Sequence, residues 1–179
     1  MISEQAKQGV EFIFMKAART NLALSADDVV DISPAIGVDV TEFPEQTIIV
    51  LTISSFLFRL MTIFHVDDNP ELKDYFTKGA TDRTLVEVLS ELGNLCCGAM
   101  NRDLLNYFPH LGMSTPYALD SKCMSFVNEL KPGFVGGYEI TINNTIQMHA
   151  SICFCEYQPI DFAVEMSAAE EDTGMLELF

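Results

Sequence analysis

The chain has 179 residues, 49% of them hydrophobic and 20% charged, a composition typical of a globular domain rather than a disordered or fibrous chain. Its 26 Asp and Glu residues outnumber its 10 Lys and Arg residues, so the formal net charge is −16. This charge excludes nucleic acid as an expected partner, because binding a phosphate backbone requires clustered Lys and Arg side chains.

The sequence also indicates a compartment. The opening residues, Met1 to Gln5, lack the basic segment of a secretory leader. The five cysteines are not spaced as a disulfide framework, so reduced thiols and a cytoplasmic location are predicted. Residues 47–64 approach the length of a membrane span, but Arg59 near their middle and their β-branched residues favour two buried strands. No membrane association is expected.

In the first half of the chain, apolar side chains recur at helical spacing over residues 4–24 and predict a helix. Residues 25–45 contain two prolines and a glycine and are predicted to be a loop-rich connection. Residues 46–66 are rich in β-branched residues and predict a pair of strands. A turn and a short helix over residues 71–78 are expected to follow.

The second half is predicted to contain a long helix, a shorter helix and a pair of strands. These elements cover residues 82–107, 118–130, 135–142 and 145–156. Thr84 and Glu87, three residues apart, form a candidate capping box at the start of the long helix. Asn143 and Asn144 tolerate positive φ and predict a tight hairpin turn between the two strands.

The order helix, hairpin, helix, hairpin predicts an α+β fold of two αββ-type halves. We expect a mostly antiparallel sheet with the two long helices exposed on one side. Residues 1–165 are predicted to form a single domain. Residues 166–179 are predicted to be an acidic C-terminal tail.

One polar stripe is the feature with the most chemical content. Its members, at spacings of three and four residues, are Glu87, Glu91, Asn94, Gly98 and Asn101. On a helix this spacing places them on one face. A glycine within a helix costs about 1 kcal/mol relative to alanine, so close approach to the backbone at Gly98 is one explanation; packing against a strand is the other. An amide such as Asn94 can hold a water molecule in a fixed direction, and the alternative is a merely solvated face.

The stripe resembles the signature of the CheC/CheX/FliY family of chemotaxis phosphatases, Asp/Ser-x3-Glu-x2-Asn-x22-Pro. Glu91 and Asn94 match this signature. Glu87 stands where the family has Asp or Ser, and Pro116 follows Asn94 after 21 residues rather than 22. The resemblance covers residues 5–165, and its single Glu-x-x-Asn motif is similar to that of the one-site, CheX-like members.

The resemblance implies a phosphatase that hydrolyses the aspartyl phosphate of a CheY-like response regulator. It implies that Asn94 aims the attacking water and that Glu91 pairs with the active-site lysine of the receiver. Glu87, Gly98 and Asn101 are then expected to contact this partner. The chain needs no cofactor of its own, because the receiver brings the Mg²⁺. CheX-like proteins pair their sheets across subunits, so a homodimer is expected.

The two long helices also invite comparison as copies of a repeat. Glu11 lies 80 residues before Glu91, and at this offset Phe14 stands where the second helix has Asn94. The first helix would then lack the amide, which again resembles a one-site member.

Two other functions remain open from the sequence. A domain of the same fold could bind the receiver without catalysis, as an adaptor, and an unrelated domain could match the short motif by chance. Exposure of Glu91 and Asn94 on one face is required by the first two functions. Cys96-Cys97 and Cys153-x-Cys155 are interpreted as buried thiols rather than as a metal site.

Overall fold

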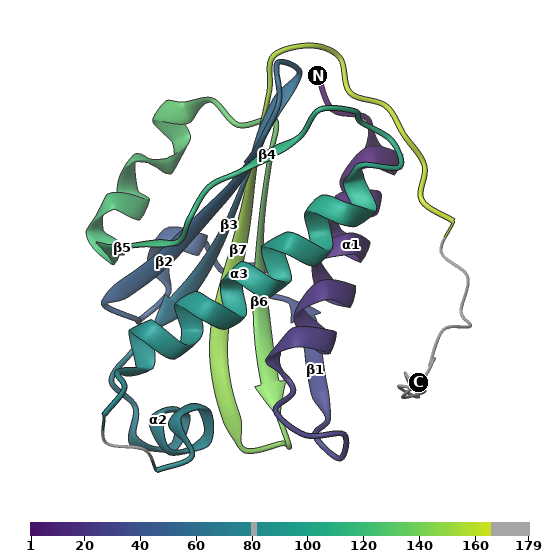
Figure 1. Ribbon diagram of the computed structural model, residues 1–179. Helices are drawn as coiled ribbons and strands as arrows, with labels where there is room; N and C mark the ends of the chain where they lie inside the picture. Colours follow the sequence, from purple (N-terminus) through teal and green to yellow (C-terminus); the bar gives the residue numbers. More distant parts are fainter. Residues whose placement is uncertain (80–81, 166–179) are drawn as a thin grey trace, which may run out of the picture.

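The computed structural model describes residues 1–79 and 82–165 (Figure 1). Its elements are α1 (Glu4–Leu22), β1 (Val30–Pro34), the short 3-10 helix η1 (Val40–Glu42), β2 (Thr47–Ser54), β3 (Phe58–Val66), α2 (Pro70–Thr77), α3 (Leu85–Leu104), β4 (Gly112–Met113), β5 (Tyr117–Asp120), the 3-10 helix η2 (Ser121–Leu130), β6 (Phe134–Ile142) and β7 (Ile146–Glu156).

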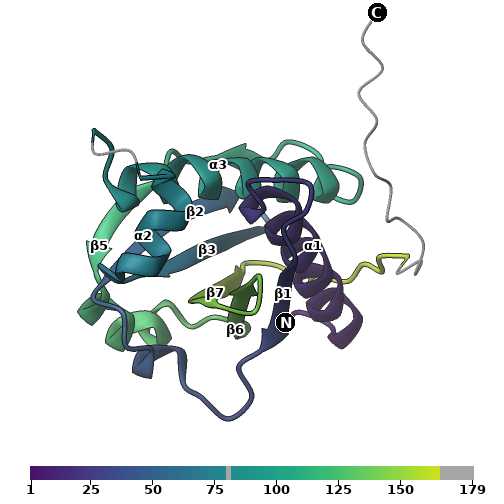
Figure 2. The same ribbon diagram turned by 90° about the horizontal axis from the view of Figure 1, so that it is seen from below.

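The described strands form one antiparallel sheet of seven, in the order β1-β6-β7-β3-β2, with β4 and β5 both pairing with β2. Helices α1 and α3 lie side by side on one face of this sheet (Figure 1). Seen from below, η1 and η2 lie on the opposite side (Figure 2). The predicted α+β fold, with an antiparallel sheet and two long helices on one side, is confirmed.

The two halves of the chain are interlocked. Each half contributes one long helix, one edge segment and one hairpin: α1, β1 and β2–β3 in the first, and α3, β4–β5 and β6–β7 in the second. Strand β1 pairs with β6 of the second half, and β5 pairs with β2 of the first. The predicted αββ halves therefore each omitted one edge segment that the structure contains. The two halves are joined at the centre of the sheet, where β3 pairs with β7.

The two missed edge strands fall in segments that were predicted to have other structures. Strand β1 falls in the predicted connection 25–45. The predicted helix 118–130 is confirmed only in part, because β5 takes its first residues and the rest is the 3-10 helix η2. All four side chains of β5 are exposed, so the strand has no alternation of buried and exposed residues. Its extended backbone is stabilised by pairing with β2, and Asp120 then caps a 3-10 helix rather than an α-helix.

The confirmed elements follow from local chemistry. Residues 47–64 form the β2–β3 hairpin, as predicted, and Asn143 and Asn144 turn the β6–β7 hairpin with φ of 52° and 57°. Of the helices in residues 1–79 and 82–165, none carries an apolar stretch of the length and hydropathy that a bilayer crossing requires.

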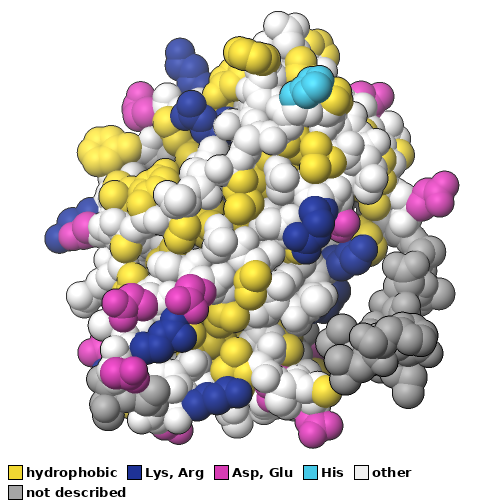
Figure 3. Space-filling view, viewed as in Figure 1, with side chains coloured by type: hydrophobic (Ala, Val, Ile, Leu, Met, Phe, Trp, Pro, Cys, Tyr) yellow, Lys and Arg dark blue, Asp and Glu magenta, His cyan; other side chains and the backbone are white. Residues whose placement is uncertain are grey.

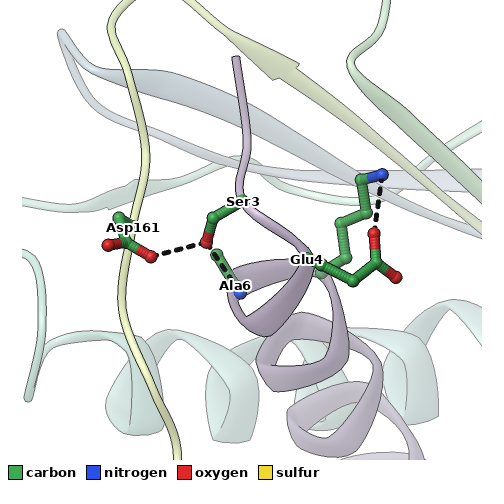
Figure 4. Close-up of polar contacts among 5 residues, drawn as sticks. Ser3, Glu4, Ala6 and Asp161 are labelled. Carbon is green, nitrogen blue, oxygen red and sulfur yellow. Dashed lines mark hydrogen bonds and ion pairs between the residues drawn. The ribbon is translucent and has the colours of Figure 1, made fainter.

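The start of α1 is tied to the segment after β7 (Figure 4). The Ser3 hydroxyl accepts a hydrogen bond from the Ala6 backbone N–H (3.2 Å) and donates one to Asp161 Oδ1 (2.6 Å). Gln5 Nε2 also donates to Asp161 Oδ1 (2.7 Å). Ser3 thus caps α1 and also anchors the segment after β7 to the start of this helix.

The opposite face of the sheet contains a buried polar pair. His65 is 1% exposed, and its Nε2 lies 2.9 Å from the hydroxyl of Ser151. Next to His65 on β7, His149 Nδ1 lies 2.6 Å from Glu45 Oε1. The ring of Phe43 contacts both imidazoles. Burial, followed by electrostatic repulsion from the neighbouring His149, lowers the pKa of His65 to about 4.

This pair predicts an acid-sensitive contribution to stability. The unfolded chain protonates His65 near pH 6.5, whereas the folded protein resists protonation down to about pH 4. The contribution is therefore complete above pH 6.5 and is lost as the pH falls from 6.5 to 4, by about 3 kcal/mol. His65→Gln, which keeps a polar atom near Ser151, is expected to flatten this part of the curve of unfolding free energy against pH. Parallel curves for variant and wild type in denaturant titrations would contradict the assignment.

Candidate functional site

The candidate site lies on α3, which begins with the predicted capping box. The Thr84 hydroxyl accepts from the Glu87 backbone N–H (3.2 Å). In return the Thr84 backbone N–H (2.7 Å) and hydroxyl (2.9 Å) donate to Glu87 Oε2. The backbone hydrogen bond from Thr84, the largest cause, lowers the pKa of the Glu87 carboxyl. Glu87 is thus engaged at the helix start rather than pointing freely toward a partner.

Glu91 and Asn94 are both exposed, one turn apart on the same face of α3. The exposed fraction of the Glu91 side chain is 68%. This is the arrangement that the two receiver-binding hypotheses require. Between them in the chain, Leu92 is half-buried and Gly93 is buried against the sheet.

The carboxylate of Glu91 has a partner that the sequence pattern did not identify. Arg83 Nη2 lies 2.6 Å from Glu91 Oε2. Its hydrogen bond to Glu91, followed by the charge attraction to Glu91, raises the pKa of Arg83. Arg83 lies just before Thr84, the N-cap of α3, and eight residues before Glu91, a spacing for which helix geometry gives no pairing rule.

The two glycines of α3 have different environments. A Cβ atom at Gly93 would lie 3.1 Å from Leu51 Cδ1 and 3.2 Å from the ring of Phe64, so this glycine permits close packing of helix on sheet. A Cβ atom at Gly98 would meet only Arg102 Nη1, at 3.8 Å. Packing against a strand therefore explains Gly93 and does not explain Gly98.

The polar stripe turns inward at its last member. Asn101 is half-buried, and its Oδ1 is buried without a hydrogen-bond partner in the described part of the chain. The exposed face continues instead through Leu95, which is 55% exposed, and Arg102. Leu95 lies four residues after Glu91, so helical spacing alone could have included it. In Figure 3 hydrophobic, acidic and basic side chains are interspersed over this side of the molecule.

A hollow of about 690 Å³ adjoins the start of α3. It is lined by the end of β3, by α2 and by the first residues of α3. Asp74 and Lys73 line it from α2, and Arg83 lines it from the α3 side. Arg83 therefore stands between this hollow and Glu91.

The repeat alignment at an offset of 80 residues is wrong. Phe14 is fully buried, with its ring 4.8 Å from that of Tyr138, whereas Asn94 is exposed. The buried positions of the two helices coincide at an offset of 83, which pairs Ile13, Phe14 and Ala17 with Cys96, Cys97 and Met100. At this offset Gln8 and Glu11 occupy the places of Glu91 and Asn94. Helix α1 thus lacks the Glu-x-x-Asn motif at either offset.

The cysteines do not offer a metal centre. Cys96, Cys97, Cys153 and Cys155 are buried and free, as predicted, and Cys123 is exposed. Burial raises the pKa of the Cys96 and Cys97 thiols to about 12, so they stay protonated and are poor metal ligands. Residues 1–79 and 82–165 contain no group of three or more His, Cys, Asp or Glu side chains arranged to hold a metal ion.

The sequence matches no protein-family model and no curated protein. Solved structures do match. The chemotaxis protein CheX from Vibrio vulnificus has a TM-score of 0.61 at 14% identity, over 82% of this chain and 99% of that one. A CheC-like superfamily protein from Shewanella sp. PV-4 has a TM-score of 0.58 at 10% identity, over 81% and 96%. A chain of the CheX–CheY–BeF₃–Mg²⁺ complex from Borrelia burgdorferi has a TM-score of 0.53 at 12% identity, over 84% of this chain and 97% of that one.

These matches define the class of fold. The chain has the CheC-like fold, an interlocked antiparallel sheet with two long helices on one face. Within that class it is similar to CheX and to the other chemotaxis proteins of the CheC/CheX/FliY group.

The contrast between the two glycines gives a prediction. Gly98→Ala is expected to raise the free energy of unfolding by about 0.5–1 kcal/mol, because alanine is the better helix former and its Cβ meets only the Arg102 side chain, at ordinary contact distance. Gly93→Ala is the matched control, in which the same gain is offset by crowding against Leu51 and Phe64. Denaturant titration measures both. A larger gain for Gly93→Ala than for Gly98→Ala would refute this description of the helix.

Proposed function

We propose that this protein is a phosphatase that hydrolyses the aspartyl phosphate of a CheY-like response regulator. The observation that carries the proposal is the exposed pair Glu91 and Asn94, one turn apart on α3. The fold adds support, because one similar structure is a CheX in complex with CheY. With a receiver as its partner, the protein would act in the cytoplasm.

In the proposed reaction the Asn94 amide holds a water molecule through its carbonyl oxygen and NH₂ group. The water attacks the phosphorus, the bond between phosphorus and the receiver's aspartate oxygen breaks, and phosphate and a free carboxylate are released. Asn94 has no titratable group at neutral pH, so its contribution is the direction of the water.

Glu91 is proposed to pair with the active-site lysine of the receiver and so to fix the position of Asn94 over the phosphoryl group. The Mg²⁺ that neutralises the phosphoryl oxygens is proposed to come with the receiver. The acidic start of α3, with Glu87 and Glu91 one turn apart, suits a partner that supplies both cations.

The rest of the exposed face fits a docking surface. Leu95 supplies an apolar contact close to Asn94, and the open backbone at Gly98 allows a partner to approach the helix closely. Glu87 would contribute through its charge at the rim. Asn101, at the inner margin of the face, would contribute least.

Two observations favour the second candidate, a receiver-binding adaptor without catalysis. Glu91 is already paired with Arg83 in the isolated chain. Glu87 replaces the Asp or Ser of the family signature and is engaged in the helix cap. An adaptor would bind the receiver at α3 and leave the rate of phosphate release unchanged.

Loss of the amide is the direct test of catalysis. Asn94→Ala is expected to reduce phosphate release from a phosphorylated receiver to the receiver's own rate, with stability changed by less than about 0.5 kcal/mol, because the side chain is exposed. Glu91→Ala is expected to weaken both receiver binding and release. Phosphate release is followed with receivers of the same organism in the presence of Mg²⁺.

Asn106→Ala is the matched control, since Asn106 is an exposed amide beyond the end of α3. It should release phosphate at the wild-type rate. Phosphate release at the wild-type rate by Asn94→Ala would contradict the proposed catalysis. Binding by the wild type without any acceleration would favour the adaptor.

We also propose that the protein forms a homodimer through a sheet edge. Leu119 on β5 is 43% exposed, and the outer side of β5 has no strand partner in the described residues. An edge of this kind pairs readily with a second copy. Light scattering at micromolar concentration is expected to give twice the chain mass of 19.9 kDa. Leu119→Lys is expected to shift this mass toward the monomer, and a monomeric wild type would contradict the proposal.

A further inference from the structure

Three carboxylates, on the segment before α3 and on its first two turns, act on one cation, Arg83. Glu87 and Asp82 attract the guanidinium of Arg83 through their charges, but the direct ion pair is with Glu91, at 2.6 Å. The Oε2 atom of Glu87 is meanwhile occupied by two hydrogen bonds from Thr84. The ion-pair partner of Arg83 is therefore Glu91, although Glu87 is nearer to Arg83 in the sequence.

We propose that Arg83 is an intramolecular competitor for Glu91 and thereby sets the affinity for the partner receiver. This inference rests on the proposed function, in which Glu91 accepts the receiver's lysine. In the free protein Arg83 occupies the carboxylate, and the incoming ammonium group must displace it. Arg83 is a positioning residue, because it acts only through Glu91.

The geometry allows this exchange. The side chains of Arg83 and Glu91 are 42% and 68% exposed, so water replaces the lost contact and the pair is weak enough to open. The backbone of Arg83 is held next to the helix cap, so the guanidinium returns readily when the receiver leaves.

The displaced guanidinium also has a place to go. Asp82 and Glu87 still attract it after Glu91 is taken. The hollow at the start of α3, which Arg83 already lines, gives the long side chain room to move. Displacement thus changes the partner of Arg83 without leaving its charge isolated.

The test is the affinity for a CheY-like receiver of the same organism loaded with beryllofluoride and Mg²⁺. Arg83→Ala is expected to lower the Kd by about two- to fivefold, the range expected for removal of one exposed ion pair. The rate of phosphate release at saturating receiver should stay unchanged. Arg83→Lys, which keeps a cation, is expected to keep the Kd within about twofold of the wild type.

Two comparisons separate competition from general electrostatics. Lys73→Ala makes the same change in net charge and lies in the same hollow, so it should leave the Kd unchanged. In a Glu91→Ala background the effect of Arg83→Ala should vanish, because the competitor then has nothing to occupy.

The outcomes are distinct. An unchanged or higher Kd in Arg83→Ala, or a gain that persists without Glu91, overturns the competition while leaving the phosphatase proposal standing. Failure of the wild type and Arg83→Ala to bind any receiver of the organism overturns the proposed function and the competition together.

Discussion

The close packing of α3 on the sheet at Gly93 determines which side of the helix meets solvent. A side chain at this position would crowd Leu51 and Phe64, so the helix can rest on β2 and β3 only with Gly93 facing inward. Because helical positions are separated by a fixed rotation, this contact turns Glu91 and Asn94 outward together. The candidate site is thus a consequence of how the core packs, and the capping box fixes where the helix begins.

The charges around the site follow from the same geometry. The capping box draws Glu87 back to Thr84, and this leaves Glu91 as the carboxylate that Arg83 can reach. A chain with net charge −16 therefore presents a locally neutralised pair where a partner's cation is proposed to bind. In the proposed binding, long-range attraction toward a basic surface and short-range competition for Glu91 would act in opposite directions.

The sequence predicted what local chemistry determines. The start of α3 was predictable from Thr84 and Glu87, and the β6–β7 turn was predictable from its two asparagines. The two long helices were predictable from the spacing of their apolar residues. It did not predict β5, whose extended backbone depends on pairing with β2 and not on its own side chains. It did not predict the Arg83–Glu91 contact or the different roles of the two glycines, because both depend on how α3 lies on its neighbours.

The interlocked sheet has a consequence for how the chain acquires its structure. Val30 pairs with Ile142, and Thr47 pairs with Asp120, so neither half can complete its own sheet during synthesis. The strands of the first hairpin must wait for β7, which lies between β3 and β6. Contacts between residues so distant in sequence slow folding, since a long loop must close before they form. The emerging chain therefore carries the apolar β2–β3 hairpin with the edge of β3 unpaired until β7 leaves the ribosome, and this interval exposes the molecule to aggregation.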